Sequence, residues 1–175
     1  MILKLLSITI SVLMVALPQA KPSAESKPVI FTDVTATAKI TWTHENLATP
    51  EKYFIETMGG GGAFLDYDRD GWMDIYLVNS GATPHHKPKA PIRNALYRNN
   101  GDGTFTDVTE KANAAASGYG QGVACGDYNN DGYADIYITN FGENILLANN
   151  CDGTFKDVTD KARVGDTRWS TSAAF

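Results

Sequence analysis

The feature that most constrains this chain is an acidic segment of nine residues that occurs twice. The first copy, DYDRDGWMD, begins at Asp66, and the second copy, DYNNDGYAD, begins at Asp127. Both copies have Asp or Asn at positions 1, 3 and 5, Gly at position 6 and Asp at position 9. Because the two copies agree at all of these positions, we expect two copies of one structural unit.

A second motif recurs beside the acidic segments. The sequences FTDVTATA, FTDVTEKA and FKDVTDKA begin at Phe31, Phe105 and Phe155. The last two follow the related turns NNGDGT and NNCDGT, and they lie 50 positions apart (155 minus 105). Insertions, including residues 81–93, lengthen the earlier spacing. A period near 50 residues is typical of solenoids and propellers, in which each unit packs against its neighbours.

Segments rich in β-branched and aromatic residues occupy matching places in the two units, and this composition is typical of buried strands. The predicted strands are residues 63–65, 75–78, 95–98 and a segment from Phe105, then 123–125, 136–139, 145–148 and a segment from Phe155. Asn-rich turns connect the last two strands of each unit and suit β-hairpins. Four antiparallel strands per unit predict an all-β fold built from β-propeller blades.

The two units are too few to close a ring, since propellers have about four to eight blades. Adding the period of 50 to Gly126 gives position 176, one past the end of the chain. We therefore expect an incomplete propeller, belonging to the N-terminal part of a longer protein. A short protein that completes a ring with partner chains is the alternative.

The acidic segments have the chemistry of calcium loops. Calcium takes six to eight oxygen ligands, several of them carboxylates. Side chains at positions 1, 3 and 5 turn inward when the backbone coils around an ion, and Gly at position 6 permits the positive φ of the reversal. Position 7 can offer a backbone carbonyl, and Asp at position 9 closes the loop. The predicted Ca²⁺ ligands are Asp66, Asp68, Asp70, Trp72 and Asp74 in the first loop, and Asp127, Asn129, Asp131, Tyr133 and Asp135 in the second.

The two predicted sites differ in charge, because Asn129 replaces a carboxylate in the second loop. Fewer charges usually weaken calcium binding, so the sequence predicts that the first loop binds more tightly. Strand-like residues follow each loop directly, which excludes a helical EF-hand. Every ligand position is filled from within the loop, so we expect the calcium to be structural. An Asx-rich turn without a metal is the alternative.

The first 28 residues have the pattern of an export signal and a linker. Lys4 precedes an apolar run from Leu5 to Leu17, which is too short to span a bilayer. We predict a signal peptide over residues 1–20, a linker over 21–28 and the repeat region over 29–175. The protein is then secreted, extracellular or periplasmic, with no membrane insertion after cleavage. An uncleaved membrane anchor is the alternative.

Composition excludes several classes of function. The formal net charge of -5 disfavours nucleic-acid binding, and the hydrophobic fraction of 43% excludes a disordered chain. Cys125 and Cys151 lie at non-matching positions of their units, which favours two free thiols over a disulfide. His85 and His86 fall in a Pro-rich insertion and indicate a solvated loop more than a metal site. No Ser/His/Asp grouping is recognisable, so we do not expect an enzyme.

Longer segments resemble known repeats. GGGGAFLDYDRDGWMDIYLVN and VACGDYNNDGYADIYITN resemble FG-GAP/VCBS repeats, with Asn129 and Cys125 as departures. FTDVTATAKITWTHEN followed by ETMGGGGAFLDYDRDG is similar to the N-terminal region of the cartilage acidic protein and ASPIC/UnbV family. Members of this family usually carry a C-terminal ASPIC/UnbV segment, which this chain lacks.

The resemblance implies a secreted calcium-binding β-propeller related to the integrin α-subunit head. Its expected role is adhesion, or binding of an extracellular protein or carbohydrate ligand. The alternative is a non-catalytic propeller portion of a larger extracellular carbohydrate-active enzyme. A catalytic domain elsewhere in the full-length protein would favour that alternative.

Overall fold

The computed structural model describes residues 29–81 and 92–175. The chain divides into two compact units, Met1–Thr32 and Asp33–Phe175, and the described residues of the first unit form no helix or strand. The predicted signal peptide and linker lie outside the described residues, as do His85 and His86. Within the described ranges, no helix is long and apolar enough to cross a membrane.

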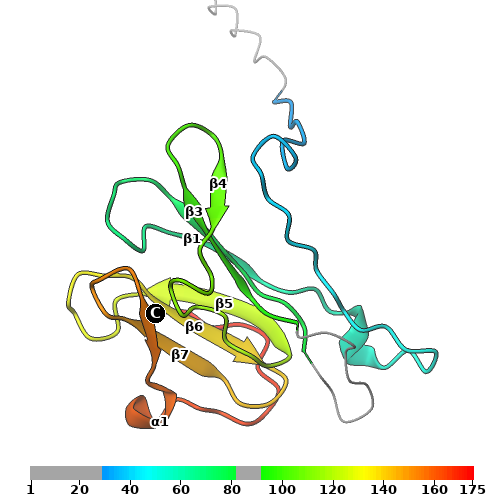
Figure 1. The fold of residues 1–175 in the computed structure, drawn as a ribbon. Helices are drawn as coiled ribbons and strands as arrows, with labels where there is room; N and C mark the ends of the chain where they lie inside the picture. Colours follow the sequence, from blue (N-terminus) through cyan, green and yellow to red (C-terminus); the bar gives the residue numbers. More distant parts are fainter. Residues whose placement is uncertain (1–28, 82–91) are drawn as a thin grey trace, which may run out of the picture. The chain divides into compact units, whose positions relative to one another are not determined.

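The unit Asp33–Phe175 contains, among its described residues, two antiparallel sheets of four strands each (Figure 1). In both sheets, strands that follow one another in sequence are hydrogen-bonded neighbours. The first sheet consists of β1 (Gly62–Leu65), β2 (Asp74–Leu77), β3 (Ala95–Asn99) and β4 (Phe105–Asp107). The second consists of β5 (Gly120–Gly126), β6 (Asp135–Asn140), β7 (Ile145–Asn149) and β8 (Phe155–Asp157). The predicted strands are thereby confirmed, and the nearly all-β architecture is consistent with an incomplete propeller.

Two short helices complete the described structure, and the strand pattern did not predict either of them. The 3-10 helix η1 (Phe54–Thr57) precedes the first sheet. The helix α1 (Thr159–Ala162) follows β8, and its C-cap residue, Arg163, has a left-handed conformation with φ of 57°.

Strand pairing repeats in register between the sheets. Ile75 of β2 lies opposite Tyr97 of β3, and the matching pair in the second sheet is Ile136 and Leu147. Because a shift of one residue would turn every side chain to the other face, the shared register gives both sheets the same division of faces.

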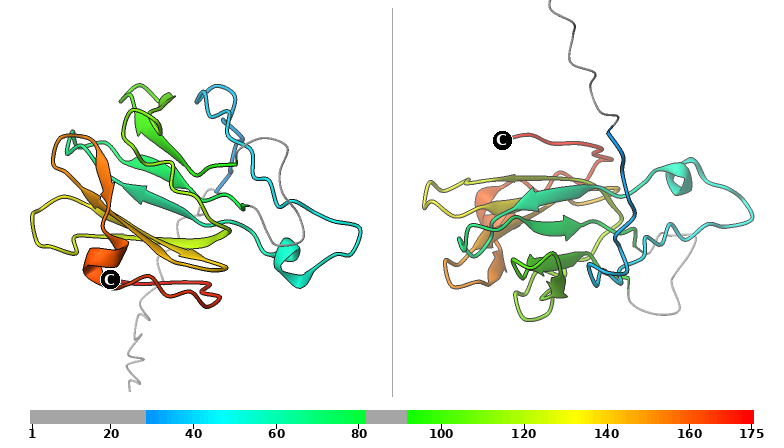
Figure 2. Two further views of the ribbon diagram at one scale, coloured as in Figure 1. Left: turned by 60° about the horizontal axis from the view of Figure 1, so that its bottom comes forward. Right: turned by 90° about the horizontal axis from the view of Figure 1, so that it is seen from above.

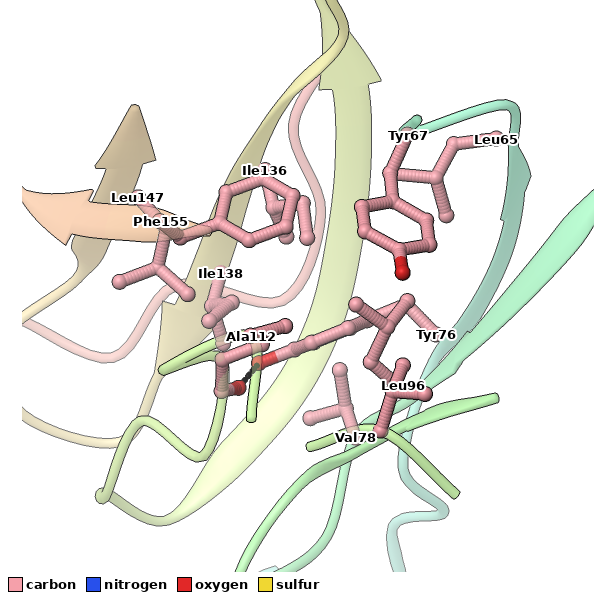
Figure 3. Packing of buried hydrophobic residues seen from close by; sticks show 12 residues of the cluster. Leu65, Tyr67, Tyr76, Val78, Leu96, Ala112, Ile136, Ile138, Leu147 and Phe155 are labelled. Atoms are coloured by element: carbon pink, nitrogen blue, oxygen red, sulfur yellow. Dashed lines mark hydrogen bonds between the residues drawn. The ribbon is translucent and has the colours of Figure 1, made fainter. Parts of the chain in front are cut away.

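The main core lies between the two sheets. Tyr76, Val78 and Leu96 come from the first sheet or its margin, and Ile136 and Leu147 come from the second. Figure 3 shows these side chains packed together, and all five are buried. Burying one such side chain contributes about 1.5–3 kcal/mol. Neither sheet can bury these side chains alone, so the two sheets depend on each other for their core.

The segment after each fourth strand is held by a tyrosine of the second strand. The Tyr76 hydroxyl donates a hydrogen bond to the Ala114 carbonyl at 2.8 Å. The Tyr137 hydroxyl donates in the same way to the Val164 carbonyl at 2.7 Å. After β4, this segment contributes Ala112 and Ala114 to the core between the two sheets.

The first strands of the two sheets approach each other at glycine. A Cβ added to Gly61, just before β1, would lie 2.8 Å from the Gly122 Cα in β5. A Cβ on Gly122 would lie 2.7 Å from the Thr171 carbonyl oxygen, in the C-terminal segment that Figure 2 draws in red. Glycine at these two positions therefore permits the close approach of the two chain segments.

Candidate metal centre

The first acidic loop connects β1 to β2 and coils around its own carboxylates. The side chain of Asp66 accepts hydrogen bonds from the amides of Asp70 at 3.1 Å and Gly71 at 3.0 Å. The amide of Trp72 donates to Asp70 Oδ1 at 2.9 Å. Gly71 has φ of 88°, the left-handed conformation that the sequence required at this position.

The second acidic loop connects β5 to β6 with the same backbone pattern. Asp127 accepts from the amides of Asp131 at 3.0 Å and Gly132 at 2.8 Å, and the Tyr133 amide donates to Asp131 Oδ1 at 2.9 Å. Gly132 has φ of 87°. The two loops are therefore structural equivalents, as their shared spacing predicted.

The aspartate at position 9 anchors each loop to the third strand of its sheet. Asp74 is fully buried and accepts from the amides of Tyr67 at 3.1 Å and Asn99 at 2.8 Å. Asp135 is equally buried and accepts from the amides of Tyr128 at 2.8 Å and Asn149 at 2.7 Å. Both carboxylates thus satisfy backbone donors that burial would otherwise leave unpaired.

Burial and neighbouring charge make these carboxylates costly to ionise. Burial raises the pKa of Asp74 to about 6, against the lowering effect of the amide hydrogen bonds from Asn99 and Tyr67. The charges of Asp68 and Asp70 raise it further. Burial also raises the pKa of Asp135. A cation beside either group favours its ionised form, so the environment suits a positively charged ligand.

Three of the predicted ligands come together in the first loop. Asp66, Asp68 and Asp74 each offer a carboxylate oxygen, and these oxygens lie within 4.8 Å of one another. Across residues 29–81 and 92–175, this is the one group of three or more acidic, His or Cys side chains close enough to hold a metal ion. The donor set is all oxygen, which fits a hard divalent cation such as Ca²⁺.

Other predicted ligands make further hydrogen bonds or ion pairs in the structure. Trp72 and Tyr133 each donate a backbone amide to the aspartate two residues earlier. Asn129 Nδ2 donates a hydrogen bond to Asp131 Oδ2 at 2.7 Å, so the side-chain amide of Asn129 occupies one oxygen of the Asp131 carboxylate. Asp70 pairs with an arginine and lies outside the group of three.

Motif spacing did not identify that arginine, Arg98 of β3, as a neighbour of the acidic loop. Its Nε donates to Asp68 Oδ2 at 2.6 Å, and its NH2 group pairs with Asp70 Oδ2. The hydrogen bond to Asp68 raises the pKa of Arg98, so the guanidinium stays charged. The equivalent position of the second unit, 148, holds Ala, so the repeat pattern carries no signal for this residue.

The two loops also contact each other. The Arg69 guanidinium, in the first loop, lies over the Tyr133 ring of the second, 5.1 Å from the ring centroid. Asn149 Nδ2, at the end of β7, donates to the Tyr67 carbonyl at 2.8 Å. The same asparagine gives its backbone amide to Asp135. Both acidic loops are therefore neighbours.

The two cysteines lie in different elements of the second sheet. Cys125 is half-buried in β5, Cys151 is exposed in the turn before β8, and both are free thiols. The prediction of two free thiols is confirmed. Cys151 has φ of 62°, and its Sγ lies 3.6 Å from Asp131 Oδ2.

Two consecutive four-stranded antiparallel units, each with the same acidic loop between its first and second strands, define a repeat protein of the β-propeller class. Residues 66–138 and 127–175 match the FG-GAP-like repeat, and the chain belongs to this family. The predicted resemblance to FG-GAP repeats is therefore confirmed. No curated protein matches the chain.

Proposed function

We propose that the chain is a secreted calcium-binding propeller module. The observation that carries this proposal is the convergence of Asp66, Asp68 and Asp74, whose ligand oxygens lie within 4.8 Å of one another. Such clustered carboxylates repel one another unless a cation neutralises them. Ca²⁺ would supply that charge, and the chain would hold it through these side chains. The equivalent fold of the second loop supports a second site at Asp127, Asp131 and Asp135.

The proposed calcium is structural. Asp66 already organises the first loop through two backbone amides, and Asp74 ties it to β3. A cation held by both residues would add a further link between the loop and the sheet. Binding to the folded state alone stabilises it by about 2.7 kcal/mol when free calcium is 100 times the dissociation constant.

The proposed biological role is binding, without catalysis. FG-GAP-like repeats form the matched part of the chain, and the net charge of -5 suits an extracellular protein or carbohydrate partner better than a polyanion. The likeness of the segments at Phe31 and Glu56 to the cartilage acidic protein and ASPIC/UnbV family supports membership of that narrower group. Expression with residues 1–28 intact, followed by fractionation, tests export from the cytoplasm.

A thermal melt of the chain in EGTA and in millimolar calcium tests the metal sites. We expect calcium to raise Tm by several degrees, and Asp68→Ala to reduce that rise. Asp102→Ala is the matched control, because Asp102 lies in the hairpin turn between β3 and β4, where it accepts hydrogen bonds from the Thr104 amide and hydroxyl. The proposal fails if calcium leaves Tm of the unsubstituted chain unchanged.

A further inference from the structure

One side chain of the first sheet occupies two carboxylates of the first acidic loop. Arg98 Nε donates to Asp68 Oδ2 at 2.6 Å, and its NH2 group pairs with Asp70 Oδ2. The remaining oxygens, Asp68 Oδ1 and Asp70 Oδ1, accept backbone amides of the loop itself. The guanidinium therefore takes those oxygens of Asp68 and Asp70 that the loop backbone leaves available.

The second unit lacks this cation. Arg98 lies opposite Thr106 on β4, and the matching residue Ala148 lies opposite Lys156 on β8. The two positions therefore share one register, 50 residues apart. In the second loop, Asp131 Oδ2 accepts from neutral groups, the Asn129 amide and the Cys151 thiol. The two acidic loops thus differ in their neutralising partner as well as in their carboxylate count.

We propose that Arg98 is an internal counter-cation that competes with Ca²⁺ for the first acidic loop. This inference rests on the proposed calcium sites and names how one of them is regulated. A guanidinium and a divalent cation repel each other, so both cannot share Asp68 Oδ2 at close range. Calcium binding must displace Arg98, and the first loop binds more weakly than its four carboxylates alone predict.

The surroundings of Arg98 leave room for this displacement. The side chain is 38% exposed, so it can turn toward solvent without breaking the core. It also lines a cavity of about 400 Å³ beside Tyr67, Lys111 and Tyr133. Lys111 adds positive charge to that cavity, which helps to keep the arginine on the carboxylates while no metal is bound.

A purely structural role for Arg98 predicts the opposite result. If the arginine served only to hold the loop in its binding shape, its removal would loosen the loop and lower calcium affinity. If it competes with calcium, its removal raises affinity. The sign of the change therefore separates the two roles.

The test measures calcium affinity calorimetrically in two backgrounds of the full chain. Asp127→Ala disables the second loop and isolates the first, while Asp66→Ala isolates the second. In the first background we expect Arg98→Ala to tighten calcium binding about two- to fivefold, the scale of one partly exposed ion pair. In the second background we expect Arg98→Ala to leave calcium affinity unchanged.

Arg93→Ala is the matched control for net charge. Arg93 belongs to the same unit but pairs with Asp107 and Glu110, away from the acidic loop. We expect it to leave the affinity of the first loop unchanged. A second readout is the rise in Tm between EGTA and calcium, which is larger in Arg98→Ala because the unliganded loop loses its counter-charge.

The outcomes distinguish the inference from the proposed function. An unchanged or lowered affinity in Arg98→Ala, with calcium still bound, overturns the competition by Arg98 alone. An equal gain in Arg93→Ala also overturns it, since general charge then explains the effect. Failure of both backgrounds to bind calcium, with Arg98 intact or replaced, overturns the calcium sites themselves.

Discussion

The backbone amide of Phe155 donates a hydrogen bond to the carbonyl of Ala112 at 2.8 Å, linking β8 to the segment that follows β4. The amide of Phe105 makes the same bond to Ala38 at 2.9 Å. Both carbonyls end a DVTxxA segment, and both phenylalanines begin the next copy of the motif. The repeated sequence FxDVTxxA is therefore the connection between successive units as well as part of each unit.

Gly61→Ala should destabilise the fold, because β1 and β5 approach too closely for a side chain. The added Cβ would lie 2.8 Å from the Gly122 Cα, which is backbone that cannot turn away. We expect a loss of about 1–3 kcal/mol in the free energy of unfolding, the usual range for overpacking. Urea denaturation in EGTA measures it.

Gly59→Ala is the control for this substitution. A Cβ at Gly59 would meet nothing within 4 Å. Both variants replace glycine by alanine, so the effect of this change on the entropy of the unfolded chain is the same in each. Equal stability of the two variants would contradict close packing of the inner strands.

Tyr76→Phe should weaken the packing between the two sheets. The Tyr76 hydroxyl is fully buried, donates to the Ala114 carbonyl at 2.8 Å and accepts from Asn94 Nδ2 at 3.2 Å. Removing it leaves two buried polar groups short of a partner, which costs about 1–3 kcal/mol. The equivalent Tyr137→Phe serves as comparison, since Tyr137 is only partly buried and water can replace its hydroxyl. A smaller loss in Tyr76→Phe than in Tyr137→Phe would contradict this ranking.

Stability should fall in acid partly through Asp107. Burial raises the pKa of this carboxyl, but hydrogen bonds from the Thr109 hydroxyl and amide and from Arg93 outweigh it and hold the pKa below its ordinary value. The folded state then binds fewer protons than the unfolded state. The stabilisation of the folded state by the Asp107 carboxylate is present above the unfolded-state pKa of about 4, and it is lost as pH falls through the lower folded-state pKa.

We therefore expect Asp107→Asn to lose stability at pH 6 and to match the unsubstituted chain more closely at pH 3. The loss should stay below about 1 kcal/mol, because the ion pair with Arg93 is partly exposed. Urea denaturation in EGTA at both pH values measures it, with Asp160→Asn in α1 as control. A constant difference at pH 6 and pH 3 would argue against a lowered pKa.

The two thiols should react at different rates. Burial raises the pKa of Cys125 to about 12, while limited desolvation and the charge of Asp131 raise the pKa of the exposed Cys151. Since the thiolate is the reactive form, iodoacetamide at pH 8 should label Cys151 first. Asp131→Asn should speed that labelling further. Mass spectrometry of the labelled chain follows both, and faster labelling of Cys125 would contradict the packing around β5.

Local features of the fold could be predicted because their signals lie close together in sequence. The acidic loop depends on side chains within nine positions, from Asp66 to Asp74, and on one left-handed glycine between them. The strands follow from short runs of β-branched and aromatic residues.

Features that join distant positions could not be predicted in the same way. Arg98 lies 30 positions from Asp68, and no spacing rule connects a strand residue to a loop before it. The stacking of Arg69 on Tyr133 joins two different units. The sequence-based ranking of calcium affinity in the two loops counted carboxylates alone. It therefore omitted the positive charge of Arg98.

By itself, the sequence determined the period, the strand order within each unit and the coiling of both acidic loops. These follow from backbone conformations and side-chain alternation over a few residues. Only the tertiary structure decided which face of each sheet is buried and which charges meet. Those outcomes depend on contacts between residues that are distant in sequence. Packing of the two sheets places Tyr76 and Ile136 in one core, and the pairing of strands brings Arg98 to the carboxylate of Asp68 in an earlier loop.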